Sequence, residues 1–164
     1  MESEFLSVEL IEYNPTTINV PHDATTIQQA LEMANDGDVI SISSGLYNGG
    51  SIIIDKEVTL TSTNPDSADV VAATIIDSTG YANRGIYFTT NAGSGAKLDG
   101  LTIANCSFGI VTADDGDEDH PDGYNGGSVS GGGIVCGTGS SPTIQNCVIR
   151  DCHISGGDAG SGAD

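Results

Sequence analysis

Acidic side chains crowd the stretch TADDGDEDHPDGYNGG, residues 112–127. Carboxylates at alternating positions are the hard oxygen ligands that calcium prefers. The stretch departs from an EF-hand loop because His120 stands in the place of the turn glycine and Gly126 in the place of the bidentate glutamate. The alternatives are a solvated acidic loop and a loop that binds carbohydrate or a protein partner. The ligands that we expect for calcium, the only cofactor that the sequence suggests, are Asp115, Asp117, Asp119 and Asp122.

The other residues with metal-binding or nucleophilic chemistry form no such group. The four cysteines contain no CxxC pair, so we expect no metal cluster on them. The three histidines have no metal-ligand spacing, and we expect them at the surface or in turns. These residues are Cys106, Cys136, Cys147 and Cys152, and His22, His120 and His153.

The elements that must position these residues are mostly short, β-branched segments separated by Gly, Asn, Asp and Ser. Such segments are typical of strands. We expect strands in VISIS (39–43), SIIID (51–55), VTLTS (58–62), TIID (74–77), GIYFTT (85–90), LTIANC (101–106), FGIVTA (108–113), GGIVC (132–136) and PTIQNCVI (142–149).

One helix is expected ahead of these strands. Thr26 and Gln29 have the spacing of a capping box. Apolar residues then recur on one helical face, and the Asn-Asp-Gly sequence at 35–37 ends it. The apolar face consists of Ile27, Ala30, Leu31 and Ala34. One helix followed only by strands makes a doubly wound α/β sheet unfavourable.

A short motif recurs among the strands: TIID at 74–77, TIAN at 102–105 and TIQN at 143–146. If residues 114 to 131 are an insertion, the period falls in the low twenties, the size of one solenoid coil. Equivalent residues of stacked coils form ladders, and we expect Asp77, Asn105 and Asn146 in one ladder and Cys106 beside Cys147 in another. In an extracellular protein a disulfide then joins Cys106 to Cys147 or Cys136 to Cys152; otherwise the cysteines are small buried side chains.

Two segments resemble a known family. Residues 26–63, TIQQALEMANDGDVISISSGLYNGGSIIIDKEVTLTST, are similar to the N-terminal cap and first coils of right-handed parallel β-helix proteins of the pectate-lyase-like group. Residues 131–149, GGGIVCGTGSSPTIQNCVI, resemble the repeats of bacterial and archaeal β-helix proteins. The resemblance covers most of residues 18–155. It implies an all-β, right-handed parallel β-helix solenoid with an N-terminal capping α-helix.

The resemblance implies less about activity, because this fold carries lyases, hydrolases, esterases, tailspikes, adhesins and inactive proteins. A lyase of the family needs a basic residue beside calcium, and a hydrolase needs paired carboxylates across a sugar bond. The basic residues (Lys56, Arg84, Lys97 and Arg150) do not cluster in sequence, and we expect them to pair with nearby acids. No catalytic residue is identified, and enzymatic activity is left undecided.

The formal net charge of −19 makes nucleic acid and anionic membranes unfavourable partners. No apolar run is long enough to span a membrane. The start, MESEFLSVELIEY, is not a secretory signal, because it carries acids where a signal carries Lys or Arg. We nevertheless expect an extracellular or cell-surface protein whose signal is not in this chain.

The expected organisation is an N-terminal extension or extra strand (1–17), a parallel β-helix (18–155) with an acidic insertion (113–131), and a Gly-rich tail (156–164). The last coil has no capping element, so either a longer parent or another partner covers its edge. Two functions are therefore open. One is an extracellular carbohydrate-associated module that binds polysaccharide; the other is a structural subunit that binds copies of itself in a fibre or surface layer, bridged by calcium.

Overall fold

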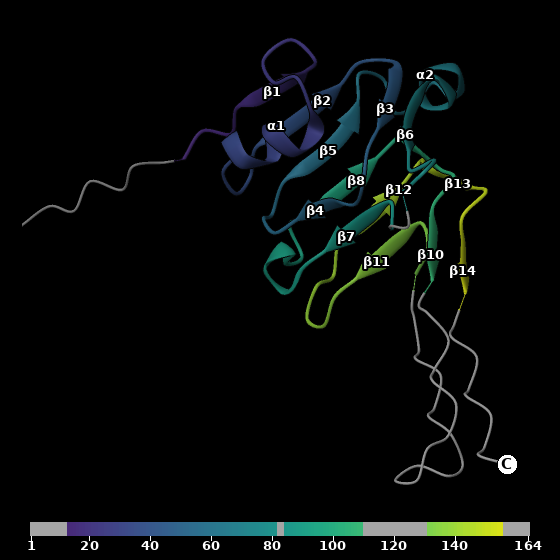
Figure 1. Cartoon of the computed structure of the whole chain (residues 1–164). Helices are drawn as coiled ribbons and strands as arrows, with labels where there is room; N and C mark the ends of the chain where they lie inside the picture. The colour runs from purple at the N-terminus through teal and green to yellow at the C-terminus, as the bar shows by residue number, and fades with distance from the viewer. Residues whose placement is uncertain (1–12, 82–83, 110–130, 156–164) are drawn as a thin grey trace, which may run out of the picture.

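The computed structural model describes residues 13–81, 84–109 and 131–155 (Figure 1). Of the residues that the structure describes, 39% lie in strands and 13% in helices. The helices are α1 (Ile27–Met33), α2 (Ala68–Ala73) and the 3-10 turn η1 (Thr90–Ala92). The strands are β1 (Thr17–Val20), β2 (Val39–Ile42), β3 (Gly45–Asn48), β4 (Ile52–Ile54), β5 (Thr59–Ser62), β6 (Thr74–Asp77), β7 (Ile86–Phe88), β8 (Lys97–Asp99), β9 (Thr102–Ala104), β10 (Ser107–Gly109), β11 (Ile134–Cys136), β12 (Thr143–Gln145), β13 (Val148–Arg150) and β14 (His153–Ser155).

The strands form four sheets in which every described pair is parallel. The sheets have the orders β1-β2-β5-β8-β12, β3-β6-β9-β13, β4-β7-β11 and β10-β14. β1 and β2 are neighbours in the five-stranded sheet; from β2 onward, consecutive strands lie in different sheets, and the chain returns to the five-stranded sheet at β5, β8 and β12. Each return adds a strand beside the previous one, so that residues far apart in sequence become neighbours.

The pairing register decides which side chains share the core. In the five-stranded sheet one continuous row of aligned positions is apolar throughout: Ile18, Ile40, Leu60, Leu98 and Ile144. Because side chains alternate between the two faces of a strand, the neighbouring rows point outward. Those rows carry mostly Thr, Ser, Asn and other polar residues, so each strand alternates between apolar and polar side chains.

Helix α1 closes the core beside β1 and β2. The Thr26 Oγ1 accepts a hydrogen bond from the Gln29 backbone N–H at 3.1 Å, as a cap requires. The Gln29 side chain accepts from Thr25 rather than Thr26, at 3.0 Å from its N–H, so the predicted box is displaced by one residue. At the other end, Lys56 Nζ donates to the carbonyls of Leu31 and Ala34, both at 2.8 Å.

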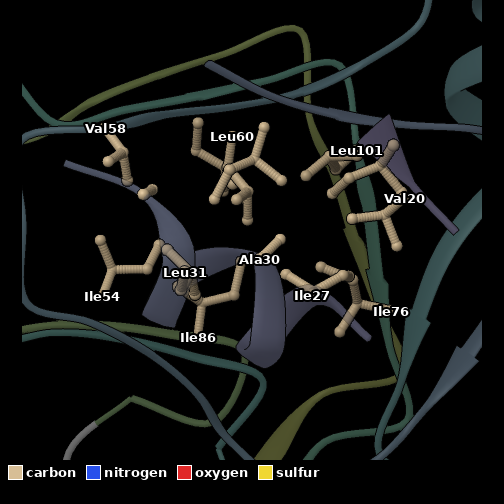
Figure 2. Close-up of a cluster of buried hydrophobic side chains, with 14 of the residues drawn as sticks. Val20, Ile27, Ala30, Leu31, Ile54, Val58, Leu60, Ile76, Ile86 and Leu101 are labelled. Atoms are coloured by element: carbon tan, nitrogen blue, oxygen red, sulfur yellow. The ribbon is translucent and has the colours of Figure 1, made fainter. Parts of the chain in front are cut away.

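The core is shared by α1 and three of the sheets. Figure 2 shows Leu31 of α1, Leu60 of β5, Ile76 of β6 and Ile86 of β7 on different sides of one buried apolar cluster. All are at most 1 % exposed. The predicted apolar face of the helix is confirmed, because its four members are all buried. Burial of these side chains stabilises the association of short strands that come from distant parts of the sequence.

Two features of the elements differ from the sequence-based expectation. Helix α2 was not expected; it is short, begins at Ser67, whose Oγ accepts from the Val70 N–H at 3.4 Å, and packs against β6 and β9. The segment PTIQNCVI is two strands, β12 and β13, because Asn146 has a φ of 53° and turns the chain between sheets. Strands β1, β3, β8 and β14 were also not expected.

Candidate functional site

The last strand of each sheet lies at an edge, and we call β11, β12, β13 and β14 together the C-terminal edge. Each of these strands has one described neighbour, on the side of β7, β8, β9 and β10 respectively. Every residue of β12, β13 and β14 is exposed. In Figure 1 they form the green-to-yellow end of the molecule, away from the purple α1 and β1. The edge therefore presents backbone groups for a further strand to bind.

The C-terminal edge also presents side chains from core positions. Ile144 is aligned with Leu98, and Ile149 with Ile103. Leu98 and Ile103 are 0 % exposed, whereas Ile144 is 40% exposed and Ile149 is 52% exposed. Ile144 and Ile149 therefore stand at positions that are buried in the preceding strands, but no described residue covers them.

The C-terminal edge has almost no charge. Residues 131–155 contain one basic side chain, Arg150, and one carboxylate, Asp151, and no other Lys, Arg, Asp or Glu. The Arg150 Nη1 lies 2.8 Å from Asp151 Oδ2, so the two charges compensate each other. On a chain with a formal net charge of −19, this is a surface that a similarly acidic molecule can approach.

Asp99 fastens this edge to the sheet that precedes it. Its carboxylate accepts hydrogen bonds at 2.9 Å from both Gln145 Nε2 and Asn146 Nδ2, and Lys97 Nζ lies 2.8 Å away. Burial pushes the pKa of Asp99 upward, but the bonds from Lys97, Asn146 and Gln145 outweigh it, so the pKa lies below its usual range. The ionised carboxylate therefore fixes the turn between β12 and β13.

The expected polar ladder of equivalent positions is not formed. Asp77 is aligned with Ala104 rather than with Asn105, although the Asn105 Nδ2 donates to Asp77 Oδ2 at 2.9 Å. The expectation for Asn146 is wrong, because this residue bonds Asp99 in a different turn. TIQN lies in the five-stranded sheet and TIAN in the four-stranded one, so the two motifs are not equivalent.

The register also corrects the cysteine ladder. Thr102 pairs with Val148, so the residues in equivalent positions are Cys106 and Cys152, and Cys147 corresponds to Leu101. Cys106 therefore does not stack on Cys147. All four cysteines are free thiols. The Cys106 side chain is fully buried, and desolvation, with the nearby Cys152 thiol, raises its pKa to about 12.

The expected calcium ligands, Asp115, Asp117, Asp119 and Asp122, lie outside the described residues, as does His120. Within the three described ranges, no group of three or more His, Cys, Asp or Glu side chains is placed to hold a metal ion. His22 Nδ1 lies 2.6 Å from Asp23, and His153 Nε2 lies 3.0 Å from Ser107 Oγ.

The basic residues have local structural partners rather than forming a catalytic group. Lys97 and Arg150 pair with acids, as expected. Arg84 lies over the Phe108 ring, 3.9 Å from its centroid, and Lys56 binds the end of α1. Among the described helices, none is long and apolar enough to cross a membrane.

A second candidate site is a cleft of about 440 Å³ between the start of α1 and the β3–β4 turn. Its lining includes the polar side chains of Thr25, Gln28, Asn48 and Ser51 beside the apolar Leu46, and it contains no charged residue. Leu46 is 57% exposed, and the Asn48 side chain forms no hydrogen bond within the described part of the chain. The cleft thus combines an apolar wall with an amide that is available to a ligand.

Comparison with known proteins adds no family assignment: no family model, curated protein or solved structure matches the chain.

Sequence reasoning missed the equivalence that defines the C-terminal edge. The signal was IANC at 103–106 against IRDC at 149–152, in which an isoleucine and a cysteine keep their places around an Asn or Asp. Asn105 and Asp151 have φ angles of 56° and 54°, so both turn the chain in the same way. The more conspicuous TIAN and TIQN echo concealed this pairing.

Proposed function

We propose that this protein is an extracellular structural subunit whose copies associate through the C-terminal edge. The observation that carries the proposal is the exposure of Ile144 and Ile149 at positions whose aligned neighbours are fully buried. Covering apolar surface at about 25 cal/mol per Å² is the main favourable term in protein association. Backbone groups on the outer side of β12 and β13, which no described strand pairs, add the directional component.

The fold that best accounts for this edge is a right-handed parallel β-helix of the pectate-lyase-like group. Three observations support it: all pairs are parallel, the chain visits the sheets in a recurring order, and the sheets share one core. Right-handed crossovers are the rule for parallel strands. An experimental structure of the full chain tests this assignment, and a left-handed or open-sheet arrangement would contradict it.

A second copy is the partner that we favour because of charge. Most of the chain repels an identical molecule, whereas residues 131–155 contain only the compensated pair of Arg150 and Asp151. The opposite side of the described core is occupied by α1. Association through the C-terminal edge alone therefore stops at a dimer, because an isologous contact uses the same surface of both copies. Growth into a fibre or layer requires a second contact, for which calcium between acidic faces is our proposal.

The experiment measures molar mass by sedimentation equilibrium across protein concentration, for the wild type, I149D and I53D. Ile149 is 52% exposed and Ile53 is 45% exposed, so the two substitutions change side chains of similar exposure at different places in the fold. We expect a dimer for the wild type and I53D and a monomer for I149D. A wild-type monomer at every concentration, or equal dissociation of both variants, would contradict the proposal.

The same samples are then measured in calcium and after chelation. Larger species that appear with calcium and disappear with chelator support the fibre or surface layer. A dimer that is indifferent to both supports association through the edge without the calcium bridge.

The uncharged cleft beside α1 favours a second function, binding of an extracellular polysaccharide. A neutral sugar presents hydroxyl groups to an amide such as Asn48 and an apolar face to Leu46. We expect a glycan-array signal that N48A loses and N91A keeps, because Asn91 is also exposed but lies on η1, outside the cleft. Absence of any glycan signal for the wild type would overturn this second proposal.

A further inference from the structure

Cys106 and Cys152 occupy equivalent positions on neighbouring strands. The His153 backbone N–H donates to the Cys106 carbonyl at 2.8 Å, and the pairing continues from Ser107 opposite His153. Each cysteine follows a residue with a left-handed backbone, Asn105 or Asp151. The two turns therefore have the same shape and direct both cysteines the same way.

The two thiols point at equivalent glycines. A Cβ atom built on Gly85 would lie 2.8 Å from Cys106 Sγ, and one on Gly133 would lie 3.3 Å from Cys152 Sγ. Gly85 and Gly133 are themselves aligned, because the Ile86 N–H donates to the Gly133 carbonyl at 2.8 Å. The Cys106 and Cys152 thiols are thus stacked against one wall of the core.

The expected separation of the two Cα atoms suits a disulfide. Neighbouring strands lie about 4.8 Å apart, and disulfide-bonded cysteines have Cα atoms about 4.4–6.8 Å apart. Neither of the other thiols shares the position: Cys147 corresponds to Leu101, and Cys136 is aligned with Phe88. The stacked thiols are the matched pair among the four cysteines.

We propose that Cys106 and Cys152 form a disulfide when the chain meets a small-molecule disulfide oxidant. The Cys152 thiolate, the more exposed of the two, attacks one sulfur of the oxidant and displaces one thiolate. The Cys106 thiolate then attacks Cys152 Sγ and displaces the second. The cysteines lose two protons and are oxidised to one disulfide, and the oxidant is reduced to two thiols.

The bond fastens β14 to β10. In the described structure the C-terminal edge is held by one line of backbone pairing in each sheet and by polar contacts such as the one between Asp99 and Asn146. A covalent link between residues 106 and 152 closes a long loop and restricts the unfolded chain, which is the main way in which a disulfide stabilises a protein.

The test uses two double variants with oxidised glutathione, followed by alkylation and intact-mass measurement. C136S/C147S keeps the stacked pair, and C136S/C152S keeps Cys106 with Cys147, the pairing that sequence reasoning suggested. We expect the first variant to lose two hydrogen atoms without an added glutathione, and to gain roughly 10 °C in Tm that a reductant removes. We expect the second variant to form no intramolecular bond.

Peptide mapping of the oxidised wild type keeps the test decisive if a variant fails to fold. A linked peptide pair containing Cys106 and Cys152 supports the proposal; alkylation of both cysteines, a lasting glutathione adduct on Cys152, or a link to another cysteine overturns it. The oxidation is run at low micromolar concentration so that the C-terminal edge is open. An intramolecular bond links no two chains, so the result of this test is independent of whether copies associate.

Discussion

At Asp38 one carboxylate binds three separate parts of the chain. It accepts hydrogen bonds from the Tyr13 hydroxyl, from the Thr16 backbone N–H at 2.6 Å and from the Asn35 N–H at 2.8 Å. The side chain is 1 % exposed. The bond from Asn35, with that from Tyr13, holds the pKa of Asp38 well below its usual range despite burial. The segment before β1 and the segment after α1 are therefore both held by the charge of Asp38.

We expect D38N to lower the free energy of unfolding by about 2 kcal/mol, because the asparagine side chain has a single oxygen and its NH₂ group cannot accept the hydrogen bonds made to the second carboxylate oxygen. A folded-state pKa below the unfolded value of 3.8 means that the contribution is complete above that pH and is lost as pH falls further. Urea unfolding measured from neutral pH down to about pH 2 checks both points. The variant should show a shallower loss at acid pH; parallel curves would contradict the assignment.

Asp38 could not have been selected from the sequence, where it is one of 23 acidic residues with no distinctive neighbour. Its role arises from donors 22 and 25 positions away, Thr16 and Tyr13. The same applies to Asp99, whose partners Gln145 and Asn146 belong to a strand pair that no local pattern indicates.

At the scale of the element, α1 was predictable because its signals are local. The cap, the apolar face and the turn that follows the helix all lie within one short stretch; α1 ends at Met33 with Ala34 as its C-cap, and Gly37 in the turn has a φ of 92° that a side chain would strain. Helix α2 lacks such a stretch and depends on β6 and β9 beneath it, through contacts such as the bond from Thr102 Oγ1 to the Val71 carbonyl at 2.8 Å.

The C-terminal end of α1 depends on a residue outside the helix. Lys56 Nζ binds the carbonyls that a helix end leaves unpaired, and its charge complements the helix dipole. We expect K56M to cost about 1–2 kcal/mol and to increase amide exchange at residues 31–34. K56R, which keeps the charge, should lose less. Equal loss in both variants would show that packing of the stem, not the charge, matters.

For the whole molecule, the parallel strand-rich class followed from the short β-branched segments, but the register did not. The expected period in the low twenties holds for the first strands, where Thr17 is aligned with Val39 and Val39 with Thr59. It fails between β5 and β8, where Thr59 is aligned with Lys97, because α2 and η1 lengthen the connections outside the sheets. Loop length has little energetic cost, so it leaves no mark on the strand pattern.

The net charge of −19 must oppose compaction of the whole chain. We expect Tm to rise by roughly 5 °C between low salt and half-molar sodium chloride, because salt screens repulsion among exposed carboxylates. Differential scanning calorimetry at neutral pH measures this. A matched series in calcium chloride separates general screening from a specific ion effect, and a Tm that falls with sodium chloride would show that favourable pairs dominate instead.

From β8, β9 and β10 to β12, β13 and β14 the offset between aligned residues is constant. Thr143 follows Lys97 by 46 positions, Val148 follows Thr102 by 46, and His153 follows Ser107 by 46. Three strands with the turns between them thus keep one common register with the strands they follow, although their sequences share little beyond Ile103 with Ile149 and Cys106 with Cys152. The spacing between turns, rather than the identity of the side chains, is therefore what these strands have in common, and any further strands in the same register would cover Ile144 and Ile149.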